Sequence, residues 1–169
     1  SISERLKQEV QKQNSRNQNR NRNQNQNETK EVYHLCEFNS NEPFNGLFNY
    51  LQKNIEGNIE DQLKITSSST RSGSPRNVIL YNNKSSFFQS YNNPNSWLCF
   101  DLQNRYVIPN YYSIRSHSYG KNCVHPKAWV IEGSLDGSNW DIINEHKNCS
   151  YLNGSSLVHS FPIRNENNK

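Results

Sequence analysis

Residues 116–126, SHSYGKNCVHP, hold the densest group of reactive side chains in this sequence of 169 residues. The group consists of His117, Tyr119, Lys121, Cys123 and His125. Imidazole nitrogens and thiolates bind zinc well, so this segment could form a zinc site together with His146 or Cys149. However, the spacing of these ligands matches no recognised zinc pattern. We therefore interpret the segment as a polar loop with ligand contacts, and we predict no metal and no cofactor.

A cysteine enzyme is the second chemistry that this loop could support. Cys123 would be the nucleophile and His125 its base, but such a pair also needs an orienting third group and an oxyanion site. Nothing in the sequence marks either of these. We therefore predict that the chain is not an enzyme.

Acidic residues offer a third kind of chemistry. Asp101 and Asp136 could act as paired carboxylates, as in glycosidases, and with Glu132 they could bind calcium. The three lie in different predicted elements and lack the spacing of a calcium loop. A turn accounts for Asp136, and polar contacts along a strand account for Asp101. His159, on an apolar strand face, is interpreted as a hydrogen-bonded, half-buried histidine.

Short segments of alternating polarity must position these residues. In SWLCFDL, residues 96–102, the side chains of Leu98, Phe100 and Leu102 share one face. In VIPNYYSIRS, residues 107–116, Tyr112 and Ile114 share a face. In SSLVHSFPI, residues 155–163, one face consists of Leu157, His159, Phe161 and Ile163. Such strands, separated by turn signals and with almost no long helix, predict an all-β fold, an antiparallel β-sandwich.

Two further segments precede these strands. FNGLFNYL carries apolar residues at helical spacing and predicts one or two helical turns; they are Phe44, Leu47, Phe48 and Leu51. LKITSSS places Leu63 and Ile65 on one face before a Ser/Gly/Pro loop from Ser67 to Pro75.

The segment HPKAWVIEGSLDGSNW, residues 125–140, predicts a hairpin. Its strand covers residues 127–134, and Asp136-Gly137 is a strong signal for a two-residue turn, where glycine takes a positive φ. Trp140 is then expected on the returning strand, near Trp129 or Ile131. Tryptophans in such places more often fill a core than face a ligand.

The positive charge lies in the N-terminal part of the chain. Residues 1–30 contain seven Lys/Arg and three Asp/Glu, whereas residues 31–169 contain twelve of each. The neutral body predicts no nucleic-acid partner. In the tail, Ile2, Leu6 and Val10 predict a helical fragment, and residues 11–27 predict a disordered Asn/Gln-rich linker. RNA binding through the linker's arginines would need interleaved aromatic residues, which the linker lacks. The predicted domains are therefore 1–30 and 31–169.

Cysteine usage and hydropathy bear on the compartment. The four cysteines are widely spaced with no CxxC pair, which favours free thiols in a reducing compartment and a cytoplasmic protein. Four Asn-x-Ser/Thr sequons argue the other way; they begin at Asn27, Asn83, Asn148 and Asn153. No apolar run approaches the ~20 residues of a membrane span.

Four motifs, in order along residues 63–163, resemble the discoidin domains, also called coagulation-factor type C domains. SWLCFDLQN resembles that family's Trp-Leu-x-x-Asp-Leu strand, and PKAWVIEGSLDGSNW resembles its strand, Ser-x-Asp-Gly turn and tryptophan. LKITSSS stands where the family has its Ala-Ser-Ser loop, and NCSYLNGSSLVHSFPI resembles its later region ending in Phe-Pro-Ile. FNGLFNYL and WVIEGSLDG further resemble the intracellular members found behind BTB domains.

The resemblance implies an eight-stranded, galactose-binding-like jelly roll without catalysis, which binds ligands through loops at one end. Family members bind glycans, phospholipid headgroups or proteins, depending on the loop sequences. Here these loops would be Ser67–Pro75, Gln89–Asn95 and Ser116–Pro126. Their candidate ligand contacts are Arg71, Tyr91, Asn92, Asn93, His117, Tyr119, Lys121 and His125.

The chain departs from the family pattern after Ile163. The family continues there with closing strands that end in a Leu/Phe-Gly signature, for which RNENNK offers no counterpart. Either the sequence is truncated or the sandwich is incomplete, with exposed edges. The terminal disulfide of the family also has no assignable counterpart.

Together these observations predict a non-catalytic ligand-recognition module in a larger intracellular protein, most simply one that binds another protein. The alternative is a glycan-binding module of an extracellular protein, with sugar contacts at Tyr91 and Tyr119. A thiol- or metal-dependent enzyme is the third hypothesis, and it depends on Cys123.

Overall fold

The computed structural model describes residues 34–80, 86–118 and 125–164. The chain divides into two compact units, Ser1–Glu37 and Phe38–Lys169. Residues 34–37, the described part of the first unit, have no regular secondary structure. The predicted N-terminal helix and Asn/Gln-rich linker lie outside the described residues. All the helices and strands described below belong to the second unit.

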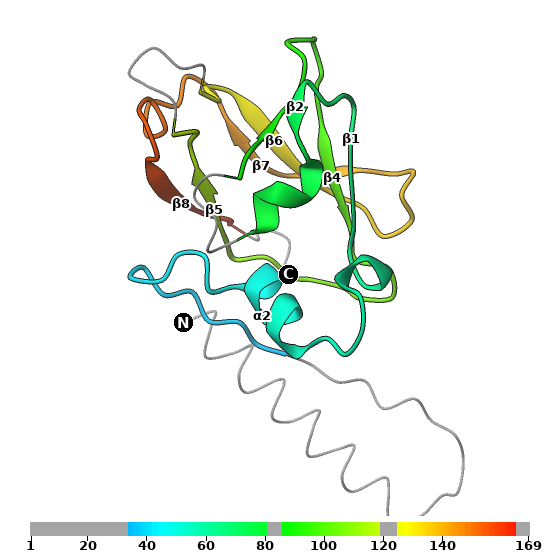
Figure 1. The fold of residues 1–169 in the computed structure, drawn as a ribbon. Helices are drawn as coiled ribbons and strands as arrows, with labels where there is room; N and C mark the ends of the chain where they lie inside the picture. Colours follow the sequence, from blue (N-terminus) through cyan, green and yellow to red (C-terminus); the bar gives the residue numbers. More distant parts are fainter. Residues whose placement is uncertain (1–33, 81–85, 119–124, 165–169) are drawn as a thin grey trace, which may run out of the picture. The chain divides into compact units, whose positions relative to one another are not determined.

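Short antiparallel strands make up most of the regular structure of this unit (Figure 1). The strands are β1 (Lys64–Ser67), β2 (Ser72–Gly73), β3 (Phe88–Gln89), β4 (Leu98–Asp101), β5 (Tyr111–Arg115), β6 (Trp129–Gly133), β7 (Asp141–His146) and β8 (Val158–Pro162). They pair as β1–β4, β2–β3, β5–β8 and β6–β7. The helical segments are α2 (Leu47–Asn54) and two 3₁₀ turns, η1 (Ile59–Asp61) and η2 (Pro75–Ile79). The prediction of a mostly β, antiparallel structure is confirmed.

The β1–β4 pair packs beside the helix. Ile65 lies opposite Phe100 in the register, and the ring of Phe48, in α2, stacks on Phe100 with 4.9 Å between centroids. Leu51 and Leu63 are buried. Phe44, predicted as part of the helix, precedes it, because α2 begins after Gly46, which occupies the N-cap. The residues at 98–101 form the predicted strand.

The main core lies between the β5–β8 and β6–β7 pairs. Its buried residues are Cys149, Leu152 and Phe161, with Tyr112, Ile114 and Trp129 packed against them. The predicted shared face of Tyr112 and Ile114 is thus confirmed. Leu157, predicted on the same face as Phe161, lies before β8 and is 41% exposed. The tyrosine hydroxyl is satisfied in this core, because Trp129 Nε1 donates to Tyr112 Oη at 2.8 Å.

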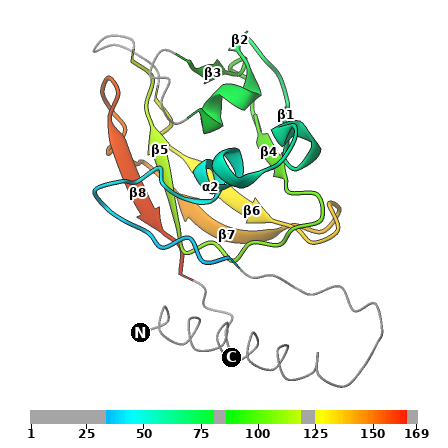
Figure 2. The same cartoon turned by 60° about the horizontal axis from the view of Figure 1, so that its bottom comes forward.

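Residues 38–46 cover the second face of the β5–β8 pair, where Figure 2 shows the chain before α2 crossing these strands. The ring of Phe38 stacks on Tyr111 with 4.1 Å between centroids. The guanidinium of Arg115 lies 4.7 Å from the centroid of the Phe44 ring. Aromatic residues of this segment therefore shield a sheet that already packs on the core through its other face.

The hairpin of β6 and β7 differs from its prediction in two ways. The connection is a seven-residue loop, Ser134–Trp140, and not a two-residue turn. Trp129 pairs with His146, at the open end of the hairpin, so Trp140 lies at the opposite end and is half exposed. The prediction that Trp140 lies near Trp129 or Ile131 is wrong. The reason is Asp136, whose carboxylate accepts the N–H groups of Ser138 and Asn139 and so holds a wider loop.

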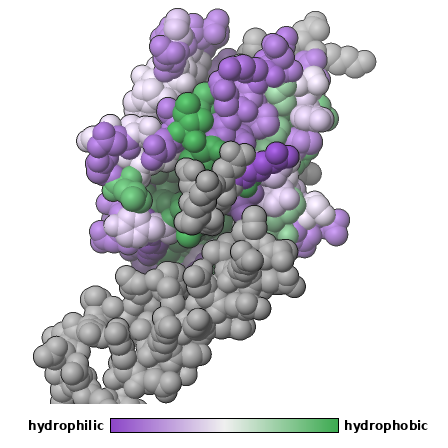
Figure 3. All heavy atoms as spheres, turned by 180° about the vertical axis from the view of Figure 1, so that it is seen from behind, coloured by the Kyte–Doolittle hydropathy of each residue, from purple (hydrophilic) through white to green (hydrophobic). Residues whose placement is uncertain are grey.

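Figure 3 views the molecule from behind and shows hydrophobic residues at the surface in separate areas among hydrophilic ones. In the described part of the chain, no helix is long and apolar enough to cross a membrane.

Candidate ligand-binding loops

The β2–β3 pair fixes the base of the first two predicted loops. Ser72 lies opposite Gln89, and Gly73 lies opposite Phe88. Gly73 has a φ of 73°, and a Cβ there would overlap the carbonyl oxygen of Phe87. Only glycine therefore fits this close approach of the two backbones.

Hydrogen bonds from two serines tie these loops together. Ser68 N–H donates to the carbonyl of Trp97 at 3.0 Å, and Trp97 N–H donates to Ser68 Oγ at 3.0 Å. Tyr91 N–H donates to Ser69 Oγ at 3.2 Å. Arg71 N–H donates to the carbonyl of Gln89 at 2.8 Å. The structure thus brings Ser67–Pro75 and Gln89–Asn95 side by side.

The second loop is also fixed from within. Ser96 Oγ lies 3.2 Å from the carbonyl oxygen of Tyr91 and 3.0 Å from that of Asn93, and it can donate to either. Asn93 N–H donates to the Tyr91 carbonyl at 2.9 Å. Asn95 takes a positive φ of 56°, a conformation that asparagine tolerates well. The loop is therefore ordered before any ligand binds.

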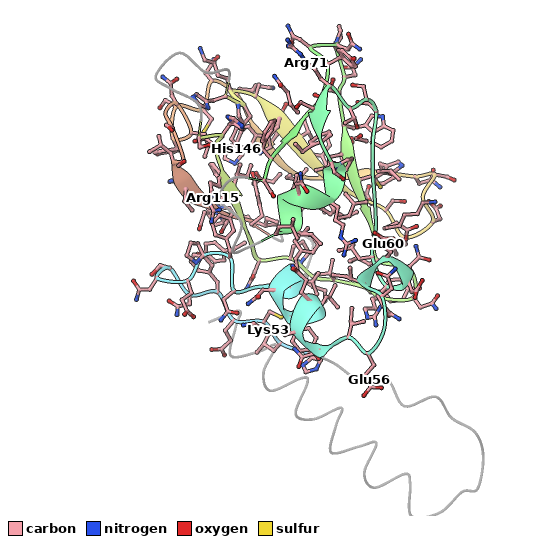
Figure 4. All side chains as sticks on the ribbon, viewed as in Figure 1. Lys53, Glu56, Glu60, Arg71, Arg115 and His146 are labelled. Carbon is pink, nitrogen blue, oxygen red and sulfur yellow. The ribbon has the colours of Figure 1, made fainter. Side chains whose placement is uncertain are left out.

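Two aromatic side chains project from these loops. Tyr91 is 53% exposed and Trp97 is 52% exposed. Arg71, Asn92 and Asn93 are exposed as well, and Figure 4 shows Arg71 at the same end of the unit as the loops. Exposed aromatic faces beside a guanidinium and amides can stack on and hydrogen-bond to a polar ligand.

Trp97 was not among the predicted ligand contacts. It belongs to SWLCFDL, which the alternation predicts as one strand, but β4 begins only at Leu98. The Pro94-Asn95 pair just before it was the signal that could have placed Trp97 in the loop.

The third predicted loop, Ser116–Pro126, is described only at its two ends. Ser116 is buried, and its Oγ donates to the carbonyl of Gly154 at 2.6 Å and accepts the N–H of Leu157 at 2.9 Å. The ring of His117 packs edge-on against Phe87 with 4.3 Å between centroids, and its carbonyl accepts the N–H of Ser156. The base of the third loop therefore lies beside the chain that enters β3. Tyr119, Lys121 and Cys123 lie outside the described residues.

Two histidines that were considered as zinc ligands and set aside, His125 and His146, have buried ring nitrogens. Both ring nitrogens of His125 and Nε2 of His146 are buried without a hydrogen-bond partner. His146 packs against Trp129 and Phe161 in the core, with 4.8 and 4.7 Å between ring centroids. Figure 4 accordingly places His146 among the strands. In residues 34–80, 86–118 and 125–164, no three potential metal ligands cluster.

The described cysteines are free thiols, and the carboxylates of Asp101 and Asp136 stabilise turns. Cys36, Cys99 and Cys149 are free, and Cys149 belongs to the core. Asp101 Oδ1 accepts the N–H of Gln103 at 2.9 Å, which stabilises the turn after β4. Backbone N–H donors from Asn139 and Ser138 hold the pKa of Asp136 well below its usual range.

His159 lies on the core side of β8 and is half buried. Its ring stacks on that of Tyr151 with 4.0 Å between centroids and meets Phe161 edge-on at 4.6 Å. This position accords with the half-buried histidine expected from the sequence.

Comparison with known proteins gives a partial similarity. No family model matches the chain. No solved structure matches it significantly. Over 72 residues, 42% of the chain, it is 31% identical to part of the E3 ubiquitin-protein ligase Ufd4 of Drosophila melanogaster. The chain spans 2% of the length of that relative.

Proposed function

We propose that residues 31–169 form a discoidin-like jelly-roll module that recognises a protein partner through its loop end and catalyses no reaction. The module belongs to a larger intracellular protein. Its ligand contacts are centred on Tyr91 and Trp97, with Arg71, Asn92 and Asn93 around them.

The strand pairing supports the discoidin-like part of this proposal. LKITSSS and SWLCFDL, the first two motifs of the resemblance, supply β1 and β4, which pair with each other. PKAWVIEGSLDGSNW supplies β6 and the connection to β7, and NCSYLNGSSLVHSFPI supplies β8, beside β5. The motifs of the resemblance therefore coincide with strands and with their pairing.

The observation that carries the function is the joining of the two loops by Ser68 and Ser69. This joining holds Tyr91, Trp97 and Arg71 in one ordered region with half or more of each aromatic side chain in solvent. Tyrosine, tryptophan and arginine are the residue types that dominate binding energy at protein interfaces, and preorganised loops lose little entropy on binding.

The partial similarity to Ufd4 favours a protein ligand and a large parent protein. The matched stretch is a small part of a ubiquitin-protein ligase. A ligase of that kind acts on proteins, so a recognition module within it would have protein targets to select. The free thiols of Cys36, Cys99 and Cys149 accord with an intracellular setting.

Site-specific photo-crosslinking tests the protein-binding proposal. A photoreactive amino acid is placed at position 91 or 97 of the full chain and irradiated in a cell extract, and adducts are identified by mass spectrometry. We expect the same protein adduct from both positions, and we expect Arg71→Ala to weaken it. Position 106, the exposed Tyr106 outside these loops, is the matched control. Adducts that are equally frequent at position 106 would contradict the proposal.

A glycan ligand is the second candidate, favoured by two exposed aromatic rings beside the amides of Asn92 and Asn93. Sugars stack on such rings and hydrogen-bond to such amides. A glycan array probed with the wild-type chain and with a Tyr91→Ala/Trp97→Ala variant tests it. Signals that the double variant loses support glycan binding, whereas an array that stays blank at millimolar sugar removes this candidate.

A further inference from the structure

The closed end of the β6–β7 hairpin presents large apolar side chains that no other described element covers. Leu135 is 87% exposed, Ile142 is 66% exposed and Trp140 is 48% exposed. In Figure 1 this end, drawn in gold on the right, points away from the β1–β2 and β3–β4 loops at the top. We call these three residues, with Glu132, the hairpin patch.

The register explains how the patch is assembled. Glu132 lies opposite Ile142, so their side chains share one face of the hairpin. Gly133 lies opposite Asp141, at the last pair before the loop. A β-bulge at Ile131/Glu132 inserts Ile143, whose side chain packs beside Gly133. The bulge thus lets Ile143 turn inward while Ile142 stays outside.

The loop between the strands holds its shape through its own side chains. Asp136 accepts the N–H groups of Ser138 and Asn139, both at 2.8 Å, and the side-chain amide of Asn139 at 2.7 Å. Ser134 Oγ accepts the N–H of Gly137 at 2.8 Å. A partner would therefore meet Leu135 and Trp140 in place, and ordering them would cost little entropy.

The charge of the hairpin specifies what could cover these residues. Residues 128–146 contain no lysine or arginine and four carboxylates, although the body from residue 31 onward is neutral overall. Glu132 and Asp141 are exposed and form no ion pair within the described residues. Glu145 is paired with Lys147, at the open end of the hairpin. Uncompensated negative charge therefore lies at the closed end, around the exposed apolar side chains.

We propose that the hairpin patch is a second docking surface, separate from the ligand-binding loops, and that its partner is a basic amphipathic polypeptide segment. Apolar side chains of the partner cover Trp140, Leu135 and Ile142, and a lysine or arginine of the partner pairs with Glu132, on the same face as Ile142. Burial of the apolar area supplies affinity, and the charges select the partner and its orientation.

A peptide of alternating lysine and leucine is the probe that tests this surface. Its binding to the full chain is followed by fluorescence anisotropy, beside a lysine/serine peptide and a glutamate/leucine peptide. We expect the lysine/leucine peptide to bind, the lysine/serine peptide to bind roughly tenfold more weakly, and the glutamate/leucine peptide not to bind. Added salt should weaken the interaction, because the charges are exposed.

Substitutions in the hairpin patch test whether the lysine/leucine peptide binds there. Trp140→Ala and Glu132→Gln should each weaken binding of the lysine/leucine peptide by about tenfold. Tyr106→Ala and Glu56→Gln, which change an exposed aromatic and an exposed carboxylate elsewhere, should leave binding unchanged. Near-ultraviolet circular dichroism checks that each variant is folded.

Three results would overturn the proposal. The first is no binding of the lysine/leucine peptide, and the second is binding that the hairpin variants do not alter. The third is a concentration-dependent dimer in sedimentation that Trp140→Ala abolishes, which would assign the hairpin patch to a second copy of the chain. None of these bears on the loops at Tyr91 and Trp97, so each docking surface can fail without the other.

Discussion

At the scale of single residues, Ser116 was predicted to belong to a ligand-binding loop, but its side chain stabilises the fold. Its hydroxyl is buried and bridges the Gly154 carbonyl and the Leu157 N–H. Ser116→Ala would leave both groups without this partner. We expect the free energy of unfolding, measured by urea denaturation, to fall by about 1–3 kcal/mol.

Ser138→Ala is the matched control for this prediction. Ser138 is exposed, and it donates its backbone N–H to Asp136, a hydrogen bond that alanine keeps. We expect Ser138→Ala to change the free energy of unfolding by no more than about 0.5 kcal/mol. Equal effects of the two substitutions would contradict the role assigned to Ser116.

The two tryptophans of the hairpin show what a residue type does and does not predict. Trp129 packs in the core, as expected for a tryptophan in a strand, whereas Trp140 is half exposed. In the sequence both belong to one predicted hairpin, although Trp129 stands in the apolar run AWVI and Trp140 stands between Asn139 and Asp141. Their difference arises from the carboxylate of Asp136, which widens the loop and moves Trp140 to the closed end of the hairpin. Such a local competition between loop geometries is not visible in hydrophobic alternation.

At the scale of elements, Asp136 makes the stability of the hairpin loop depend on pH. Hydrogen bonds from Asn139 and Ser138 depress the pKa of this carboxyl in the folded chain. A depressed folded pKa contributes stability that is present above the unfolded value, about 3.9, and that is lost as the pH falls below it. Asp136→Asn removes this contribution.

The measurement is the melting temperature of wild type and Asp136→Asn between pH 2 and pH 7. We expect the wild type to be the more stable near neutral pH and the difference to shrink steadily below about pH 4. Ser138→Ala, in the same loop and without a titratable group, is the control and should show no such convergence, because it keeps the backbone N–H that Asp136 accepts. A wild-type advantage that grows on acidification would refute the assignment.

The β2–β3 pair supplies the second prediction at this scale, because it supports the proposed ligand loops. A Cβ at residue 73 would overlap the Phe87 carbonyl, in a backbone conformation that alanine rarely adopts. We expect Gly73→Ala to lower the free energy of unfolding by more than about 1 kcal/mol and to weaken crosslinking at positions 91 and 97. Gly46→Ala, at a position with open space and negative φ, should lower the free energy of unfolding less, because only the N-cap preference for glycine over alanine is lost. If Gly73→Ala behaves like Gly46→Ala, the loops do not depend on this pair.

At the scale of the whole molecule, the alternation predicted which segments are strands but not which strands meet. The strands at 111–115 and 158–162 pair across more than forty residues, and β1 pairs with β4 although β2, η2 and β3 lie between them in the sequence. Alternation reports only which face of a strand is apolar. Pairing depends on loop closure and on shared burial, which are properties of the folded chain. The discoidin resemblance supplied an expected arrangement of the strands and loops, which stays a prediction.

Phe161 is the residue on which this pairing depends most directly. It is almost fully buried in β8 and stacks on Tyr112 of β5, while it meets Trp129 of β6 and His146 of β7. One ring thus joins four strands from two separate pairs. Phe161→Ala removes contacts in all of them, and we expect the free energy of unfolding to fall by about 3–5 kcal/mol. The free energy of unfolding of a small domain is only about 5–15 kcal/mol in total, so the variant should be close to unfolding at room temperature.

The experiment combines urea denaturation with the fluorescence of Trp129, isolated in a Trp97→Phe/Trp140→Phe background. Phe100→Ala is the control, because Phe100 is a phenylalanine of another sheet and is partly exposed. We expect Phe100→Ala to lower the free energy of unfolding clearly less than Phe161→Ala does and to leave the Trp129 emission unchanged. Phe161→Leu should recover much of the lost stability, because it refills most of the cavity. A Phe161→Ala variant that unfolds at the wild-type urea concentration would mean that the β5–β8 and β6–β7 pairs are held together by something other than this ring.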